Sequence, residues 1–291
     1  MTQFLLLSVG GLRIGAIYAL AAIGLVVIHK ATKAVNFAHG AFIMLGAYGA
    51  FLCAERWGLP NWQVYIIVPV AVGLLAAAFE YLVLRRMRTA DAFSLVIVTV
   101  FAGTLGSEAI RIVFESETLA VAPVWSGSPI ILGPLILTLE TLWIIGGAIV
   151  CGLAGIYVFS RAGMGRAMRA MSANIRGAQL CGYSVNLVYA QAWFLGGLLA
   201  GLAGLFAAPR LGVSPELATA TIVPAFVAAI IGGFDSLKGA VLGGIILGLL
   251  ETYTAAFLPP TFKNAFTFLL LMMVLLFMPD GLFPERRTRR V

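Results

Sequence analysis

The chain has 291 residues, of which 61% are hydrophobic and only 11% are charged, and its mean hydropathy is +1.02. This composition excludes a soluble domain with a polar exterior and predicts a polytopic membrane protein. The net charge of +7 does not require a nucleic-acid partner, because basic loops beside anionic lipid account for it.

Helices are expected throughout, because backbone in lipid must satisfy its own hydrogen bonds and the alternating pattern of a membrane barrel is absent. A bilayer core of about 30 Å needs roughly 20 apolar residues per helix. The sequence therefore predicts an all-α bundle of eight or nine spans that forms a single membrane domain over residues 1–291. The expected segments are 5–28, 36–53, 62–84, 92–113, 137–159, 186–208, 220–234, 239–257 and 263–279.

The first segment is expected to be a retained helix rather than a cleaved signal peptide, because no basic region precedes it and Arg13 interrupts it. Arg13 is expected to reach the interface or to pair with an acidic group on another helix. Gly11 and Gly15 lie four residues apart and share one helical face, which predicts close helix packing. The same spacing recurs at Gly197/Gly201, Gly239/Gly243 and Gly244/Gly248.

Polar residues stand at the start of the second segment. Asn36 could cap this helix by accepting a backbone hydrogen bond, while His39 satisfies local backbone groups. The alternative interpretation is that Asn36 and His39 line the cytoplasmic mouth of a solute pathway.

Ionisable residues also mark the third and fourth segments, where burial in lipid is costly. Glu80 precedes the basic cluster Arg85–Arg88 and is expected to serve topology or packing at the cytoplasmic rim. Glu108 and Arg111 are three residues apart on one helix, which predicts a structural ion pair.

The loop at about 160–185 is a basic, helix-prone island in an otherwise apolar chain. Met168, Met171 and Ile175 recur at helical spacing, with arginines on a neighbouring face, and predict one short amphipathic helix. It either rests on anionic lipid or docks a cytoplasmic subunit. The small residues expected to allow close approach of that subunit are Ala167, Ala170, Ala173 and Ala178.

The last part of the chain contains residues that interrupt helices and one glutamate within an apolar segment. Pro224 and Gly232-Gly233 predict a broken or re-entrant helix near 220–240, whose freed backbone groups could meet a solute. Glu251 is expected to be either a gate residue of the pathway or a buried, hydrogen-bonded structural carboxyl.

Orientation follows from the basic residues, because positively charged loops stay on the cytoplasmic side. This rule places the 160–185 loop and the basic tail 280–291 in the cytoplasm and the start of the chain outside. One set of loops holds 14 of the 19 basic residues: Lys30, Lys33, Arg85, Arg86, Arg88, Arg161, Arg166, Arg169, Arg176, Lys238, Arg286, Arg287, Arg289 and Arg290.

Enzymatic chemistry has little support. The sequence contains no phosphate-cradling loop, nucleophile elbow, HExxH or CxxC motif, so we expect no catalytic residues, no cofactor and no ATP hydrolysis by the chain itself. Cys53, Cys151 and Cys181 lack metal-ligand spacing and a disulfide pattern, so no metal site is predicted.

Three motifs carry a specific resemblance. Gly165 to Gly182 reads G-R-A-x-R-A-x-x-x-N-x-x-x-A-x-x-x-G, which is similar to the cytoplasmic coupling loop of ABC importer permeases. Asn36 to Gly40 reads N-F-A-H-G, and Gly232 to Ala240 reads G-G-x-x-S-x-x-G-A. Along the chain the motifs follow each other at 36–40, 165–182 and 232–240. In this chain order they resemble branched-chain amino acid ABC transporter permeases of the LivH/LivM type, over residues 8–283.

The resemblance implies a bacterial inner-membrane subunit that imports leucine, isoleucine or valine with ATP hydrolysed by its partners. Those partners would be a second homologous permease, two cytoplasmic ABC ATPase subunits and an extracytoplasmic solute-binding protein. ATPase coupling is expected at Gly165, Arg166, Ala167, Arg169, Ala170, Asn174, Ala178 and Gly182. The substrate pathway is expected at Asn36, His39, Pro224, Gly232, Gly233 and Glu251.

Three alternatives remain open from the sequence. Related permeases of the same family are suited to urea or short amides. An ATP-independent channel or secondary carrier could share the glycine-rich broken helices. A scaffold subunit of a membrane enzyme would show neither ATPase association nor solute flux.

Overall fold

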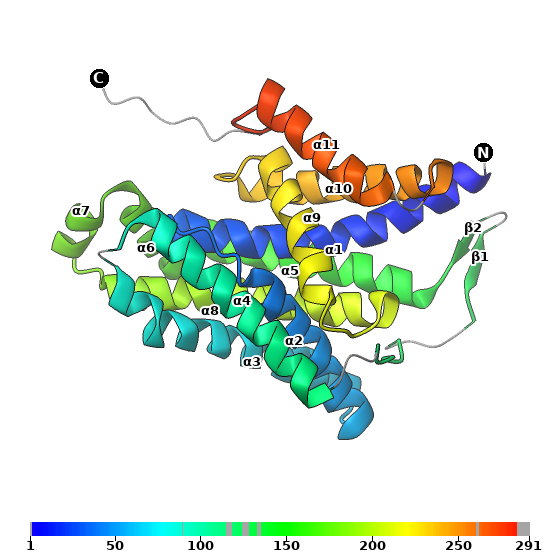
Figure 1. Ribbon diagram of the computed structural model, residues 1–291, viewed down its shortest axis with the longest axis horizontal. Helices are drawn as coiled ribbons and strands as arrows, with labels where there is room; N and C mark the ends of the chain where they lie inside the picture. Colours follow the sequence, from blue (N-terminus) through cyan, green and yellow to red (C-terminus); the bar gives the residue numbers. More distant parts are fainter. Residues whose placement is uncertain are drawn as a thin grey trace.

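The computed structural model describes residues 2–88, 90–114, 118–123, 128–132, 135–259 and 262–283 (Figure 1). Its long helices are α1 (Thr2–Thr32), α3 (Asn61–Leu82), α4 (Ala92–Phe114), α5 (Leu139–Arg161), α8 (Val185–Leu211) and α10 (Leu237–Phe257). Shorter helices are α2 (His39–Phe51), the π-helical η1 (Leu52–Arg56), the 3-10 helix η2 (Leu84–Met87), α6 (Gly163–Ala173), α7 (Ile175–Leu180), α9 (Leu217–Gly232) and α11 (Phe262–Phe277). The predicted all-α membrane bundle is confirmed.

Within the described residues, six helical segments are long and apolar enough to cross a bilayer. They are the six long helices named above, with α3 extended through η2 to Met87. The apolar helices Leu217–Gly232 and Ala265–Phe277 are shorter, so the number of spans stays a prediction. A small hairpin was not predicted: β1 (Ile130–Leu132) pairs antiparallel with β2 (Leu135–Leu137). Strands of three residues are too short to show a period-two pattern in the sequence.

Two helices occupy the centre of the bundle. In both α1 and α8, 83% of the residues in the apolar 18-residue stretch are buried, compared with 6% in the corresponding stretch of α4. α1 packs on α5, α8, α9 and α10, while α8 packs on α2 and α3. α4 therefore lies on the outside of the bundle.

Glycine spacing explains how the central helices pack closely against their neighbours. A Cβ on Gly15 would lie 2.9 Å from the Gly244 carbonyl oxygen, and a Cβ on Gly11 would lie 2.8 Å from the Cα of Leu249. On α8, a Cβ on Gly201 would lie 3.0 Å from the Cα of Pro69. These distances exclude a side chain, so the prediction of close packing at the four-residue glycine pairs is confirmed.

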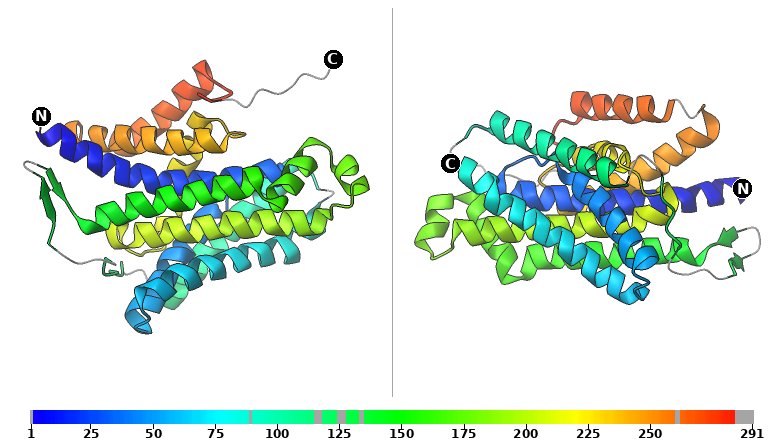
Figure 2. Two further views of the ribbon diagram at one scale, coloured as in Figure 1. Left: turned by 180° about the vertical axis from the view of Figure 1, so that it is seen from behind. Right: turned by 60° about the horizontal axis from the view of Figure 1, so that its bottom comes forward.

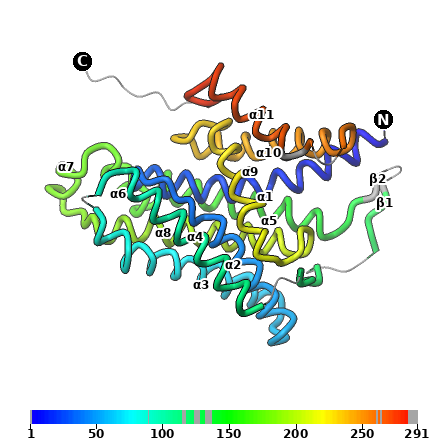
Figure 3. Tube along the Cα trace, viewed as in Figure 1, coloured from blue at the N-terminus to red at the C-terminus, as the bar shows by residue number. Residues whose placement is uncertain are grey.

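The two ends of the bundle differ. α6 and α7 lie at one end, and the N-terminus and the β1–β2 hairpin lie at the other, as both Figure 1 and the reverse view in Figure 2 show. α9, yellow in Figure 3, runs across the direction of α1.

The interruption predicted within 220–240 lies at Gly233 rather than at Pro224, because α9 is continuous from Leu217 to Gly232 with Pro224 inside it. A proline removes one intrahelical hydrogen bond, which a helix packed among neighbours tolerates. The chain turns instead at Gly233, whose φ of +101° suits glycine. α10 then begins at Leu237 and is capped by Ser236, whose side chain accepts a 3.1 Å hydrogen bond from the Gly239 N–H.

Candidate functional site

The basic loop folds as two helices rather than the single helix predicted. α6 ends at Ala173 and α7 begins at Ile175, with Asn174 between them in an extended conformation. Asn174 Oδ1 accepts a 2.9 Å hydrogen bond from the Gly177 N–H and so caps α7. The single-helix prediction is wrong because this cap favours a new helix start over continuation of α6. We call residues 163–183 the elbow.

The inner face of the elbow is anchored to the bundle. Gly165, Ala167, Met168, Met171 and Ala178 are buried, and α6 packs on α1, α5 and α8. A Cβ on Gly165 would overlap the Phe159 carbonyl at the end of α5. Ala167 and Ala178 therefore pack within this chain and do not form a docking surface, contrary to the prediction from their small size.

Phe159, near the end of α5, contacts residues of both the elbow and α1. Arg169 Nη1 donates a hydrogen bond to the Phe159 carbonyl oxygen. The Arg169 guanidinium carbon lies 5.8 Å from the centroid of the Phe159 ring, and Lys30 Nζ at the end of α1 lies 5.2 Å from it. Both distances suit cation–π contacts, so Phe159 links α6 to both α1 and α5.

The outer face of the elbow carries an apolar tip on α7. Leu180 is 90% exposed, and Ile175 and Tyr183 are also exposed. Ile175 leaves the buried methionine stripe because the helix breaks at Asn174. The tip turns at Gly182 (φ +85°), where the Gly182 N–H donates to the Gln179 carbonyl and the Tyr183 N–H to the Ala178 carbonyl, a Schellman motif.

Sequence reasoning missed Leu180 and Tyr183 as surface residues. The available signal was the pair of large apolar residues on either side of Gly182 in a polar loop. Among the predicted coupling residues, Arg166, Asn174 and Gly182 are exposed beside this tip, and Arg169 and Ala170 are partly buried.

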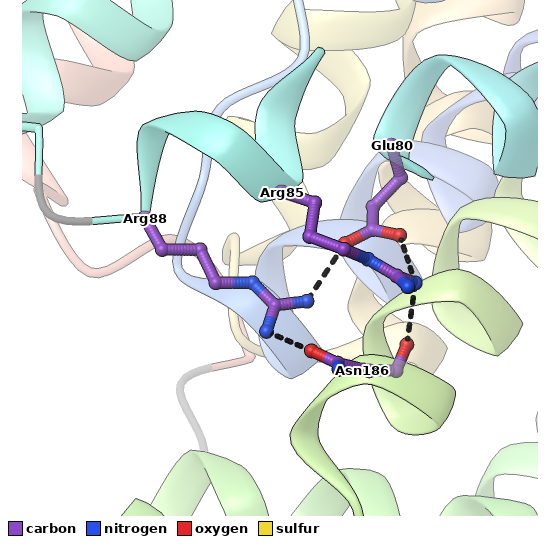
Figure 4. A network of polar contacts seen from close by, with 4 residues as sticks. All are labelled: Glu80, Arg85, Arg88 and Asn186. Carbon is purple, nitrogen blue, oxygen red and sulfur yellow. Dashed lines mark hydrogen bonds and ion pairs between the residues drawn. The ribbon is translucent and has the colours of Figure 1, made fainter. Parts of the chain in front are cut away.

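A polar network joins the start of α8 to the end of α3 (Figure 4). Glu80 is buried and pairs with Arg85 at 3.0 Å and with Arg88 at 2.9 Å. Arg85 also donates to the Asn186 carbonyl at 3.2 Å, and Arg88 donates to Asn186 Oδ1. The expectation that Glu80 serves packing beside the basic cluster is confirmed, and Asn186 is its unpredicted partner.

A cavity of about 740 Å³ separates the elbow from the end of α3. Glu80, Arg88 and Asn186 line one side, while Ile175 and Gln179 of α7 line another. The elbow thus borders open space on the side where α7 faces the end of α3.

Comparison with known proteins identifies the family of this chain. A family model described as "Branched-chain amino acid transport system / permease component" matches residues 7–275. The chain belongs to this family. The related proteins are membrane permeases rather than enzymes.

Several curated relatives of this permease match it over nearly their whole length. The high-affinity branched-chain amino acid transport system permease protein LivH of Salmonella typhimurium is 27% identical, with 99% of this chain and 98% of that protein covered. The corresponding protein BraD of Pseudomonas aeruginosa is 28% identical, with 97% and 96% covered. The xylose transport system permease protein XylH of Escherichia coli is 31% identical, but over only 38% of this chain and 30% of that protein.

A solved structure shares the fold. PsaBC from Streptococcus pneumoniae, in complex with Fab, matches 93% of this chain and 91% of its own with a TM-score of 0.52 and 14% sequence identity. At this identity the match supports the fold and nothing finer.

Asn36 and His39 of the permease are both buried, with exposed fractions of 1% and 0%. α2 begins at His39 after Ala38 and has no side-chain cap, so the predicted cap by Asn36 is wrong. Asn36 lies two residues before the cap position, too far along the chain to reach the free N–H groups. His39 Nε2 instead forms a 3.1 Å hydrogen bond with the Ala21 carbonyl of α1.

The backbone groups at the end of α9 are engaged within the chain. The Ile231 carbonyl accepts from the Leu282 N–H at 2.8 Å, and the Gly232 carbonyl accepts from the Phe283 N–H at 3.2 Å. The prediction that Gly232-Gly233 frees these groups is therefore wrong for this conformation, because the segment after α11 folds back onto them. The basic tail 280–291 is described only as far as Phe283, and the rest of it lies outside the described residues.

Four further ionisable residues have partners within the chain. Glu251 is buried and hydrogen-bonded to Tyr18 of α1, which agrees with the structural alternative of the two considered. Arg13 Nη1 donates to Thr141 Oγ1 on α5 at 3.2 Å. The predicted pair of Glu108 and Arg111 is confirmed at 3.4 Å. Among the described residues, no group of three or more His, Cys, Asp or Glu could hold a metal.

Proposed function

We propose that this permease is the translocating subunit of an ATP-driven importer for branched-chain amino acids. The observation that supports this most directly is the elbow, whose inner face is anchored to α1, α5 and α8 while its outer face exposes Leu180, Ile175 and Tyr183. An exposed apolar tip beside arginines is the surface that a cytoplasmic partner would cover. The names of the curated relatives, which describe branched-chain amino acid transport, support the substrate class.

The proposed orientation places the elbow in the cytoplasm and the N-terminus outside. Contacts gather the basic loops at the elbow end: Lys30 and Arg169 meet at Phe159, and Arg88 meets Asn186. Lys33 pairs with Asp235 at 3.3 Å in the loop between α9 and α10. Clustering of positive charge at one end supports retention of that end on the cytoplasmic side.

In the proposed mechanism, ATP-driven closure of two partner ATPases displaces α7 towards the cavity beside it. Arg169 and Gly165 transmit the displacement to α5 and α1, and the network around Glu80 transmits it from α8 to α3. The bundle and a second, homologous permease subunit then alternate between inward-open and outward-open states. A solute-binding protein would deliver the amino acid at the opposite end.

We propose that the pathway includes Asn36 and His39, which are closed to solvent in this conformation. Gly232 and Gly233 border the turn that would open it, and Pro224 lies inside the helix that leads to this turn. Release of the segment after α11 would free the Ile231 and Gly232 carbonyls. Glu251 would support the pathway indirectly, through its contact with Tyr18 of α1.

Reconstitution tests the proposal. The permease, co-purified with its native partners from the source membrane, is placed in proteoliposomes, and uptake of labelled leucine and urea is measured with and without ATP. ATP-dependent uptake of leucine supports the proposal. ATP-dependent uptake of urea alone would assign the amide alternative, and uptake that persists without any associated ATPase would assign a channel or secondary carrier.

A further inference from the structure

A second cavity, of about 280 Å³, lies where the beginnings of α2 and α9 meet α4. The two helix starts touch at Gly40, where a Cβ would overlap the Ala218 carbonyl. Ligand pockets for drug-sized molecules begin at roughly 300 Å³, so this cavity suits a molecule of amino-acid size rather than a peptide. It includes none of the pathway residues predicted from the sequence.

One end of this cavity is charged. Arg111 Nη2 lies 3.2 Å from Glu216 Oε1, and Arg111 Nε lies 3.4 Å from Glu108 Oε2. The three side chains are 41%, 58% and 56% exposed respectively, so a solute can reach them and exchange with their contacts. Two carboxylates share one guanidinium, which leaves a surplus of negative charge for a cation.

The other end is apolar. Phe37, Val100 and Ile222 line it, and Phe37 is held in place by stacking on Phe226 at a centroid distance of 4.8 Å. Gly40 and Gly103 add no side chain to the wall and leave the space open. A ligand that matches both ends needs a zwitterionic head and a short hydrocarbon side chain.

We propose that this cavity binds an L-α-amino acid with a small apolar side chain. This rests on the proposed function and adds the position of the substrate to it. The guanidinium of Arg111 takes the α-carboxylate, because its fork of N–H donors matches a carboxylate. Glu108 and Glu216 take the α-ammonium, and the side chain lies against Phe37, Val100 and Ile222. Urea has no charge to pair with either group.

Thiol protection tests the site. Thr104 lines the cavity, and Thr104→Cys is introduced into the permease within its full complex in nanodiscs. The rate of modification by N-ethylmaleimide is followed for each cysteine by peptide mass spectrometry. L-Leucine at about ten times its dissociation constant is expected to slow modification about tenfold by mass action. The native Cys151 on α5, which is partly buried and does not line the cavity, is the internal control and should react at an unchanged rate.

The ligand's two charges are tested separately. Isopentylamine lacks the carboxylate, 4-methylpentanoate lacks the ammonium, and neither these nor urea should protect the thiol. Arg111→Gln in the same background should abolish protection by leucine, whereas Arg56→Gln, outside the cavity, should leave it intact. If Thr104→Cys does not assemble, Ser107→Cys, which also lines the cavity, replaces it.

The outcomes separate this inference from the proposed function. Leucine uptake driven by ATP without thiol protection would overturn the cavity site and leave the importer standing. Equal protection by isopentylamine or urea would also overturn it. Protection by leucine in a complex that shows no ATP-dependent uptake would support the site and overturn the importer.

Discussion

Glu80 at the end of α3 and Asn186 in the first turn of α8 hold the same two arginines, Arg85 and Arg88, from opposite sides. The two residues are more than a hundred positions apart in the sequence, and α3 and α8 pack along each other. The network therefore closes this helix pair at the end where the elbow enters α8. Loss of the shared arginine contacts would separate movement of α8 from movement of α3.

Glu80→Gln is expected to lower the stability of the permease, because a neutral amide cannot pair with two guanidinium groups. We expect a loss of about 1–2 kcal/mol in the free energy of unfolding. This is below the roughly 3–5 kcal/mol of fully buried pairs, because the side chains of Arg85 and Arg88 are a quarter exposed. The apparent Tm of the purified protein in detergent is the measurement.

The matched control for this change is Asp235→Asn, which removes the carboxylate of the exposed Lys33–Asp235 pair at the same end of the bundle. Exposed pairs contribute about 0–1 kcal/mol, so its Tm should change little. Equal decreases in apparent Tm for the two variants would show that burial of Glu80 does not increase its contribution to stability.

Gly244→Ala is expected to destabilise the central helix pair. A Cβ at this position would lie 2.6 Å from the Cα of Ala19, so α1 and α10 would have to separate. Overpacking of this kind costs about 1–3 kcal/mol. Gly146→Ala on α5 is the control, because a Cβ there meets nothing within 4 Å. A fall in apparent Tm for Gly244→Ala alone is the expected result, and equal falls would count against backbone contact as the reason for glycine.

The sequence predicted the membrane helices well because each apolar stretch is long and is bounded by charge or proline. The predicted segment 92–113 and the helix Ala92–Phe114 almost coincide. Glycine pairs could also be interpreted correctly, because a four-residue spacing has one geometric meaning on a helix. The sequence could not decide between Pro224 and Gly233 as the point of interruption within 220–240, since tertiary packing decides whether a proline interrupts a helix.

The candidate sites were harder to predict because they depend on distant segments. Nothing local connects Glu216 with Arg111, or Asn186 with the arginines that Glu80 holds. These contacts exist only once α4 meets the start of α9 and α3 packs on α8. The exposed Leu180 was overlooked because a helical-period pattern was extended through Asn174. An asparagine three residues before a glycine N–H is a cap signal that could have divided the loop correctly.

Leu180→Ser is expected to weaken association with a cytoplasmic ATPase while leaving the fold intact, since Leu180 is 90% exposed. Full burial of a leucine contributes about 1.5–3 kcal/mol, so its loss should raise the dissociation constant about tenfold or more. Titration of the purified ATPase onto the permease in nanodiscs measures this. Val150→Ser on the exposed face of α5 is the control and should bind the ATPase normally. Unchanged binding of Leu180→Ser would remove the α7 tip from the docking surface.

Asn174 is expected to set the angle at which α7 meets its partner. Asn174→Ala removes the hydrogen bond to the Gly177 N–H, and loss of such a cap costs about 1 kcal/mol. Since α7 has only 6 residues, this loss should fray it and lower the number of leucine molecules imported per ATP hydrolysed. Asn174→Ser retains a capping oxygen and should preserve that ratio. If Asn174→Ser were impaired as much as Asn174→Ala, the asparagine would act by contacting the ATPase directly, because only the cap is common to asparagine and serine.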